Sequence, residues 1–144
     1  MPRVKIDLPE NFSFTTTIPI RITDINYGGH VGNDSILSII HEARVQFFKQ
    51  FGYSELDLGG VGIIMSDVAI EYKNEIFYGE EVIASVAMGE VTKVAFDLIY
   101  KLEKRLADKL VPVAFAKTWI VCYDYTLKKV AAIPADTLKK ITGQ

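Results

Sequence analysis

The chain has 144 residues, of which 49% are hydrophobic and 24% are charged, and its formal net charge is −2. These values are typical of a globular protein, and we expect residues 1–144 to form a single domain with its own core. No run of Lys or Arg is concentrated enough to form the basic surface that nucleic acid or an anionic membrane requires. The composition therefore argues against both as partners.

Cysteine and histidine are scarce. Cys122 is the only cysteine, so an intrachain disulfide is excluded, and its place in an apolar run predicts a buried thiol. The two histidines, His30 and His41, lack the spacing of a helical metal site, so we expect no metal. The N-terminus has no apolar secretory signal, and no segment reaches the ~20 apolar residues that cross a bilayer. We therefore expect a cytoplasmic protein.

The first predicted element is a strand over residues 12–22, because apolar residues occupy the even positions there. Pro19 lies on the polar face and cannot donate a ladder hydrogen bond, which favours a sheet edge or a bulge. The predicted apolar face consists of Phe12, Phe14, Ile18, Ile20 and Ile22.

A long helix is predicted next, over residues 34–51, because apolar residues recur there at steps of three and four. Asn33 or Asp34 can cap its start, and Gly52 stands where a C-terminal glycine belongs. The aromatic residues Phe47, Phe48 and Phe51 follow the helical spacing and are expected in the core.

The remainder of the chain alternates again with period two and predicts four strands near residues 68–72, 82–88, 94–102 and 111–123, followed by a short helix over 134–141. This order predicts an α+β fold in which an antiparallel sheet curls around one central helix. Such a sheet leaves exposed strand edges, and a second subunit commonly covers them.

The residues suited to chemistry lie where the first strand runs into the helix. Asp24 continues the inward face of the strand, where a carboxylate is costly unless it is paired or used. Gly28, Gly29 and Gly32 allow the backbone to approach a ligand closely. The helical amides that follow can stabilise a negative oxygen, as the hydrolysis of a thioester requires.

The pattern Asp24-x-Asn26-x-x-Gly29-His30-Val31-x-Asn33, followed by Glu42-Ala43-Arg44, resembles the hotdog-fold acyl-CoA thioesterases related to 4-hydroxybenzoyl-CoA thioesterase. The resemblance implies hydrolysis of an acyl-CoA or a related acyl thioester without a metal or an organic cofactor. It also implies a homodimer or homotetramer with active sites at subunit interfaces, where the pantetheine arm enters.

Asn26 departs from this family pattern, since the best-studied branch has there the aspartate that acts as nucleophile or base. An amide can do neither, but it can hydrogen-bond the thioester carbonyl or hold a water. Another group must then supply the base, and Asp24 and Asp34 are the nearest candidates, followed by His30 and Glu42. The catalytic set expected from the sequence is Asp24, Asn26, His30 and Asp34.

Several of these residues also have a structural interpretation. Asp24 can pair with Arg21 or Arg44, Asp34 can cap the helix, and His30 can bond the backbone of its own turn. Glu42 can bridge to a buried polar partner or to the other subunit. The residues expected to contact substrate are Tyr27, Val31, Gly32, Asn33 and Glu42, with the thioester carbonyl on the amides near Val31 and Gly32.

Three functions remain open at this point. The first is acyl-CoA hydrolysis, with Asp24 or Asp34 activating water. The second is an acyl-CoA-binding module without catalysis, which the replacement of the expected acid by Asn26 favours. The third is hydration or dehydration of a 3-hydroxyacyl thioester, although the Asp-His or Glu-His spacing usual for that chemistry is absent.

Overall fold

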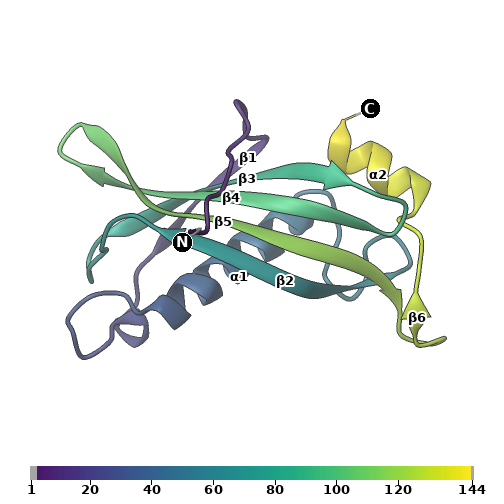
Figure 1. The fold of residues 1–144 in the computed structure, drawn as a ribbon, viewed down its shortest axis with the longest axis horizontal. Coiled ribbons are helices and arrows are strands. Elements are labelled where there is room, and N and C mark those ends of the chain that lie inside the picture. The colour runs from purple at the N-terminus through teal and green to yellow at the C-terminus, as the bar shows by residue number, and fades with distance from the viewer. Residues whose placement is uncertain (1–2, 144) are drawn as a thin grey trace.

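The computed structural model describes residues 3–143, which form one antiparallel sheet and two α-helices (Figure 1). The chain runs through β1 (Phe14–Pro19), a 3-10 helix η1 (Ile22–Asp24), α1 (Asn33–Lys49), β2 (Gly62–Tyr72), β3 (Glu81–Val91), β4 (Ala95–Leu106), β5 (Lys109–Asp124), β6 (Lys129–Val130) and α2 (Ala135–Thr142). The strand order is β1-β3-β4-β5-β2, with β6 paired to β5, and every pairing is antiparallel.

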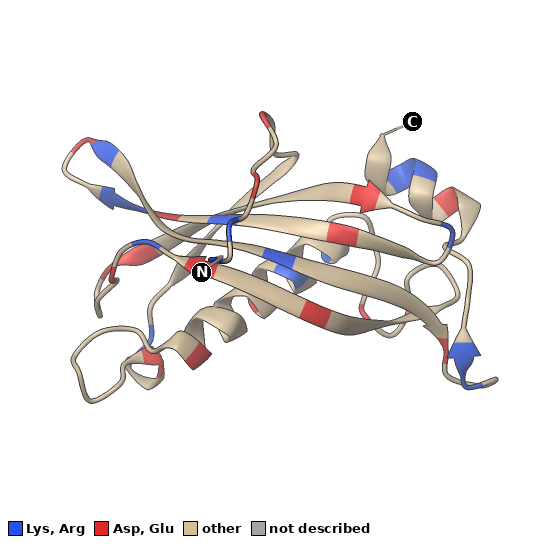
Figure 2. Cartoon of the chain, in the orientation of Figure 1, with Lys and Arg blue, Asp and Glu red and all other residues tan. Residues whose placement is uncertain are grey.

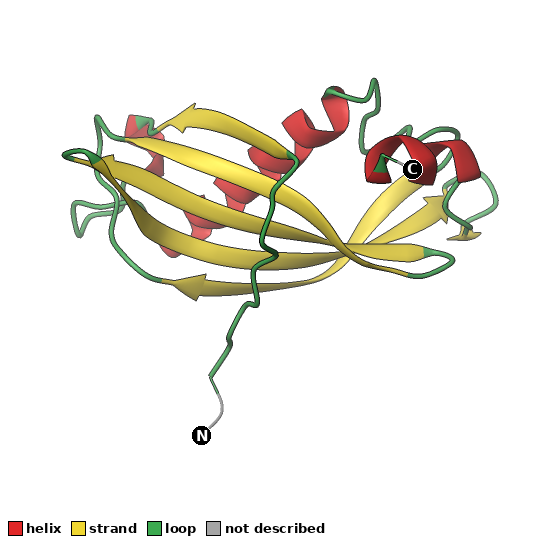
Figure 3. Ribbon diagram, turned by 90° about the horizontal axis from the view of Figure 1, so that it is seen from above, coloured by secondary structure: helices red, strands yellow, loops and turns green. Residues whose placement is uncertain are grey.

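Helix α1 lies along one face of the sheet, which curves around it, while the segment before β1 crosses the opposite face (Figure 3). That segment is attached to the sheet where the Ile6 amide donates to Glu71 of β2 and the Lys101 ammonium of β4 lies over the Phe12 ring. The predicted α+β hotdog architecture, a sheet wrapped around one long helix, is confirmed.

The core lies between α1 and the concave face of the sheet. Ile40, Ala43, Phe47 and Phe48 of α1 are fully buried, and the Phe48 ring meets Phe96 of β4 edge to face with centroids 6.3 Å apart. Phe47 and Phe48 are therefore core residues, as predicted, and the partly buried Phe51 packs against them. The apolar stripe fixes how α1 is rotated, and this rotation positions its N-terminus.

The predicted element boundaries shift in ways that have local causes. β1 ends at Pro19, and Ile22 enters the 3-10 helix with its side chain two-thirds exposed, so the alternation breaks there. α1 begins at Asn33 with Gly32 as its N-cap, which corrects the assignment of Asn33 or Asp34 to that position. It ends at Lys49, and Gly52 with φ of +81° then turns the chain away.

β2 is an edge strand and is longer than the strand predicted near residues 68–72. The prediction missed its first half because that half lacks a clear apolar alternation. It carries a bulge between Met65 and Asp67, and residues 64–68 are exposed. β1, which contains Pro19, forms the opposite edge of the sheet, as the proline predicted. Within residues 3–143, no helix combines the length and the apolar character needed to traverse a bilayer.

Truncation of Phe48 tests whether burial of α1 stabilises the fold. We expect Phe48→Ala to lower the free energy of unfolding by about 3–5 kcal/mol, because it leaves a cavity against Phe96. Urea denaturation followed by circular dichroism measures this change. Val45→Ala, on the exposed side of the same helix, is the control and should cost less than about 1 kcal/mol. Equal losses in the two variants would contradict this packing.

Candidate active site at the start of the central helix

The loop between η1 and α1 is a tight turn held by its own backbone. Ile25 and Val31 form an isolated antiparallel bridge, and the backbone N–H of Asn26 donates to the His30 carbonyl at 2.9 Å. Gly29 sits at the bend with φ of +87°, a conformation that a side chain disfavours. The Asn26 side chain is part of the turn, since its Oδ1 accepts from the Gly28 amide at 2.9 Å. The loop therefore presents its polar groups in fixed positions.

The first turn of α1 has no side-chain cap. Gly32 is the N-cap residue, its backbone is extended, and glycine has no side-chain oxygen to offer the amides that follow. The Val31 amide donates to the Ile76 carbonyl at 2.9 Å, and the Gly32 amide donates to the Asp24 carbonyl at 3.1 Å. The backbone amides of Val31 and Gly32 themselves are thus engaged, so the donors that a carbonyl near them can meet are the helix amides that follow.

The donors left without a helical partner are the amides of Asn33, Asp34 and Ser35, because the first amides of any α-helix lack an acceptor one turn earlier. The helix dipole adds partial positive charge at the same end. This end of α1 can therefore stabilise a negatively charged oxygen.

Gly32 brings Asn26 and Asp34 together. A Cβ atom on Gly32 would lie 2.6 Å from Asp34 Oδ1, 3.5 Å from Asn26 Cβ and 3.6 Å from Asn26 Nδ2. Because Gly32 has no side chain, the side chains of Asn26 and Asp34 can both pack against its backbone, beside the uncapped amides. Both Asn26 and Asp34 are exposed to solvent and so to an incoming ligand.

The Asp24 carboxylate lies in a different environment from that of Asp34. Its carboxylate is 4% exposed, accepts from the Arg21 amide at 2.9 Å and forms an ion pair with the Arg21 guanidinium at 3.3 Å. It lines a groove of about 320 Å³ between β1 and α1 together with Glu42, whose Oε2 accepts from Gln46 at 2.7 Å. The structure therefore shows the pairing of Asp24 with Arg21, and it places Asp24 and Glu42 in a groove whose described lining includes neither Asn26 nor Asp34.

His30 lies beside Asn26, since a Cβ atom on Gly28 would be 3.1 Å from Asn26 Oδ1 and 3.6 Å from His30 Nε2. It lines a cavity of about 170 Å³ together with Asn33 and Tyr72. Its Nδ1 lies 3.0 Å from the Val31 carbonyl oxygen, and its Nε2 lies 3.8 Å from Glu75 Oε1. The Tyr72 hydroxyl donates to the Asn33 carbonyl at 3.3 Å. Burial, and then the nearby Asp34 carboxylate, raise the pKa of Tyr72. Sequence analysis missed Glu75, since it follows β2 and no spacing rule links it to His30.

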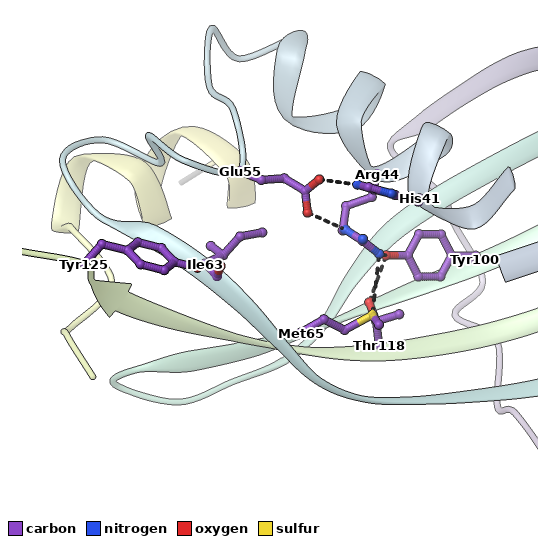
Figure 4. A network of polar contacts seen from close by, with 8 residues as sticks. All are labelled: His41, Arg44, Glu55, Ile63, Met65, Tyr100, Thr118 and Tyr125. Atoms are coloured by element: carbon purple, nitrogen blue, oxygen red, sulfur yellow. Dashed lines mark hydrogen bonds and ion pairs between the residues drawn. The ribbon is translucent and has the colours of Figure 1, made fainter. Parts of the chain in front are cut away.

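Behind the site, a buried polar network ties α1 to the sheet (Figure 4). Arg44 Nε donates to Glu55 at 3.0 Å and Nη1 donates to the Tyr100 hydroxyl at 3.5 Å, which also bonds Thr118 at 2.8 Å. His41 contacts the second oxygen of Glu55. Burial opposes the charge of Arg44, but Tyr100 and Glu55 more than offset this effect, so the pKa of Arg44 is raised. The network locks the helix against β4 and β5.

Charged residues are distributed unevenly along the fold. Figure 2 shows acidic residues at η1 and at the N-terminal end of α1, with basic residues on α2 and at β6. The fully exposed Tyr27 projects from the loop of the candidate site. Among residues 3–143, no group of three or more His, Cys, Asp or Glu side chains is placed to hold a metal ion.

Comparison with known proteins identifies the family. Residues 20–141 match the model of the thioesterase-like superfamily. The fold is similar to 4-hydroxybenzoyl-CoA thioesterase from Pseudomonas sp. strain CBS-3, at a TM-score of 0.79 and 15% identity over 90% of this chain and 99% of that one. The fold is also similar to a 1,4-dihydroxy-2-naphthoyl-CoA thioesterase from Synechocystis, at a TM-score of 0.79 and 19% identity over 90% of this chain and 95% of that one. For the DHNA-CoA thioesterase from Staphylococcus aureus the TM-score is 0.77 and the identity is 18% over 90% of each chain. No curated protein sequence matches the chain.

Cys122 should be inert in the folded protein. Its thiol is fully buried, and burial raises its pKa to about 11, so little reactive thiolate forms at pH 8. We expect Ellman's reagent to detect no thiol in the native protein and one thiol per chain in 6 M guanidinium chloride. Rapid labelling of the native protein at pH 8 would contradict this burial.

Proposed function

Because this chain belongs to the thioesterase-like superfamily, we propose that it hydrolyses the thioester bond of an acyl-CoA or a related acyl thioester. The observation that supports this proposal most directly is the uncapped first turn of α1, which lies beside Asn26 and Asp34. The three relatives named above are thioesterases for CoA esters, which favours CoA as the carrier here.

In the proposed reaction, the thioester carbonyl oxygen lies on the amides of Asn33, Asp34 and Ser35. These donors stabilise the negative charge that develops as water attacks, and a single donor of this kind typically contributes about 10²–10³-fold in rate. They need little reorganisation during the reaction, because the helix already holds them in place. Tyr27 and Asn33 are both exposed and are the residues proposed to contact the substrate as it enters.

Asp34 is the proposed base. It takes a proton from the attacking water, whose oxygen bonds to the carbonyl carbon, and the carbon–sulfur bond then breaks to release the thiol. Asn26 orients the carbonyl or the water through Nδ2, because its Oδ1 already accepts from Gly28. Asp24 is less suited to this role, since Arg21 holds it in the separate groove.

A second candidate function is acyl-CoA binding without hydrolysis. The observation that favours it is Asn26, an amide that cannot act as the nucleophile or base of the best-studied branch. Binding would use the same helix amides, because a carbonyl or carboxylate oxygen meets the same donors whether or not water attacks.

Free-thiol release from a panel of short, medium, long-chain and aromatic acyl-CoAs tests the two functions. We expect release from at least one member, and a loss of about 100-fold or more in kcat for Asp34→Asn, because the amide cannot accept the proton. Asn26→Ala should also lower kcat. The inert Cys122 thiol keeps the background of such an assay low.

Asp24→Asn is the matched control for Asp34→Asn, since it removes a carboxylate of the same loop outside the proposed site. It should lower stability through the loss of the Arg21 pair and change kcat much less than Asp34→Asn does. If Asp34→Asn retains full activity, Asp34 is not the base. A panel without hydrolysis, combined with measurable acyl-CoA binding, supports the binding module.

We also propose that the active unit is a homodimer or homotetramer of the cytoplasm, where CoA thioesters are available. The support is the edge strand β2, whose Ile64, Met65 and Val68 side chains are each more than one-third exposed. An apolar edge strand with unpaired backbone groups is a template for another chain. Pairing of β2 with a second copy would bury these side chains and extend the sheet.

Size-exclusion chromatography with light scattering measures this assembly. We expect a mass of two or four times the 16.1 kDa chain, and a shift toward the monomer for Val68→Lys, which places a charge in the β2 edge. Leu127→Lys, at an equally apolar but distant exposed turn, should leave the mass unchanged. A wild-type mass of one chain at micromolar concentration would contradict the proposed assembly.

A further inference from the structure

An imidazole and a carboxylate, those of His30 and Glu75, face each other beside the start of α1. Glu75 Oε1 lies 3.8 Å from His30 Nε2, and both residues line the cavity of about 170 Å³ beside the start of α1. The Glu75 side chain is 62% exposed and that of His30 is 31% exposed, so both can meet a ligand and water. A separation of 3.8 Å is too long for a direct hydrogen bond, so His30 Nε2 can still donate to a ligand in the cavity.

The backbone around Glu75 is held firmly. The Glu75 carbonyl accepts from Lys104 Nζ at 2.8 Å, and the Lys104 side chain is only 9% exposed and pairs with Glu80 at 3.3 Å. The next carbonyl, that of Ile76, accepts from the Val31 amide, and the Ile76 side chain is buried. A buried lysine is expensive to maintain, and here it fixes the segment that carries Glu75 against the His30 loop.

The backbone also fixes the protonation pattern of the imidazole. A carbonyl oxygen can only accept, so His30 Nδ1 must donate its hydrogen to the Val31 carbonyl. Nε2 is then the nitrogen that gains or loses a proton, and it is the one that faces Glu75 and the cavity. His30 therefore presents to the cavity the nitrogen that can pass a proton to a bound group.

We propose that His30 is the general acid that protonates the departing thiolate and that Glu75 is the positioning residue that holds the imidazolium. This inference rests on the proposed hydrolysis and adds the second proton transfer to it. After Asp34 has taken the proton of the attacking water, the tetrahedral intermediate collapses and the carbon–sulfur electron pair moves to sulfur. The Nε2 proton of His30 then passes to sulfur. His30 regains a proton from solvent, and Asp34 releases one.

Other charged and titratable groups face the same cavity or its rim. Tyr72 and Lys73 line it, and Lys73 Nζ pairs with Glu71 on the outer side at 2.6 Å. Lys104 reaches the Glu75 carbonyl from β4, and Asp34 lies near Tyr72. Glu75 is the carboxylate whose distance to the His30 ring marks it as the partner of the imidazolium, so its removal should act on His30 directly.

The test compares Glu75→Gln and His30→Gln with Glu81→Gln, an exposed carboxylate of the same region that lies at the start of β3. Thiol release is measured between pH 5 and pH 9 on the best acyl-CoA of the panel and on an S-aryl thioester of the same acyl group. An aryl thiolate leaves without protonation, so the second substrate does not need the acid. Thermal midpoints are measured for each variant to exclude unfolding.

We expect Glu75→Gln to lower kcat on the acyl-CoA about tenfold with little change in KM, and His30→Gln to lower it about 100-fold. Both variants should act on the aryl thioester at rates close to wild type. Glu81→Gln should match wild type throughout.

Two results would overturn the inference and leave the proposed function intact. One is an active wild type whose Glu75→Gln variant keeps the same kcat on the acyl-CoA. The other is an equal loss on the acyl-CoA and the aryl thioester, which would show a structural role for the pair. A wild type that releases thiol from no substrate defeats the proposed function itself, and the inference falls with it.

Discussion

The start of α1 depends on two backbone hydrogen bonds that cross from distant parts of the chain. The Val31 amide donates to Ile76 and the Gly32 amide donates to Asp24, so the last residues before the helix are attached to the loop after β2 and to η1. Gly32 then begins the helix without a capping side chain. These constraints leave the next three amides without a helical acceptor, and they hold Asn26, Asp34 and His30 around one short stretch of backbone.

The rest of the fold keeps that helix end in place. Burial of the apolar stripe on α1 supplies the main driving force, since residues such as Ile40 and Phe47 are completely removed from water. The polar network of Arg44, Glu55 and Tyr100 fixes the orientation of α1 relative to the sheet, because a buried guanidinium without these partners would be strongly unfavourable. The helix can therefore neither rotate nor slide without breaking the network, so its N-terminal amides remain aimed at the site.

Much of the fold could be predicted from local patterns, because period-two and helical alternation reflect which face of each element is buried. The long helix, the order of the elements and the core aromatics Phe47 and Phe48 follow from this rule. The motif from Asp24 to Asn33 also located the loop of the candidate site. Contacts between distant segments were beyond local patterns. Glu75 approaches His30 only because β2 returns the chain to the helix start. The local pair of Asp24 with Arg21 was one of two alternatives that the sequence offered, and η1 forms the one with Arg21.

The most direct test of the account is the effect of placing a capping side chain on the first turn of α1. Gly32 has φ of −73° and ψ of 158°, which a serine can adopt, and a serine hydroxyl there accepts from the amides of the next residues. Gly32→Ala displaces the Asp34 carboxylate in the same way but offers no acceptor. We expect Gly32→Ser to be at least as stable as Gly32→Ala toward urea, yet to release thiol about 100-fold more slowly. Equal rates in the two variants would contradict the role of these amides.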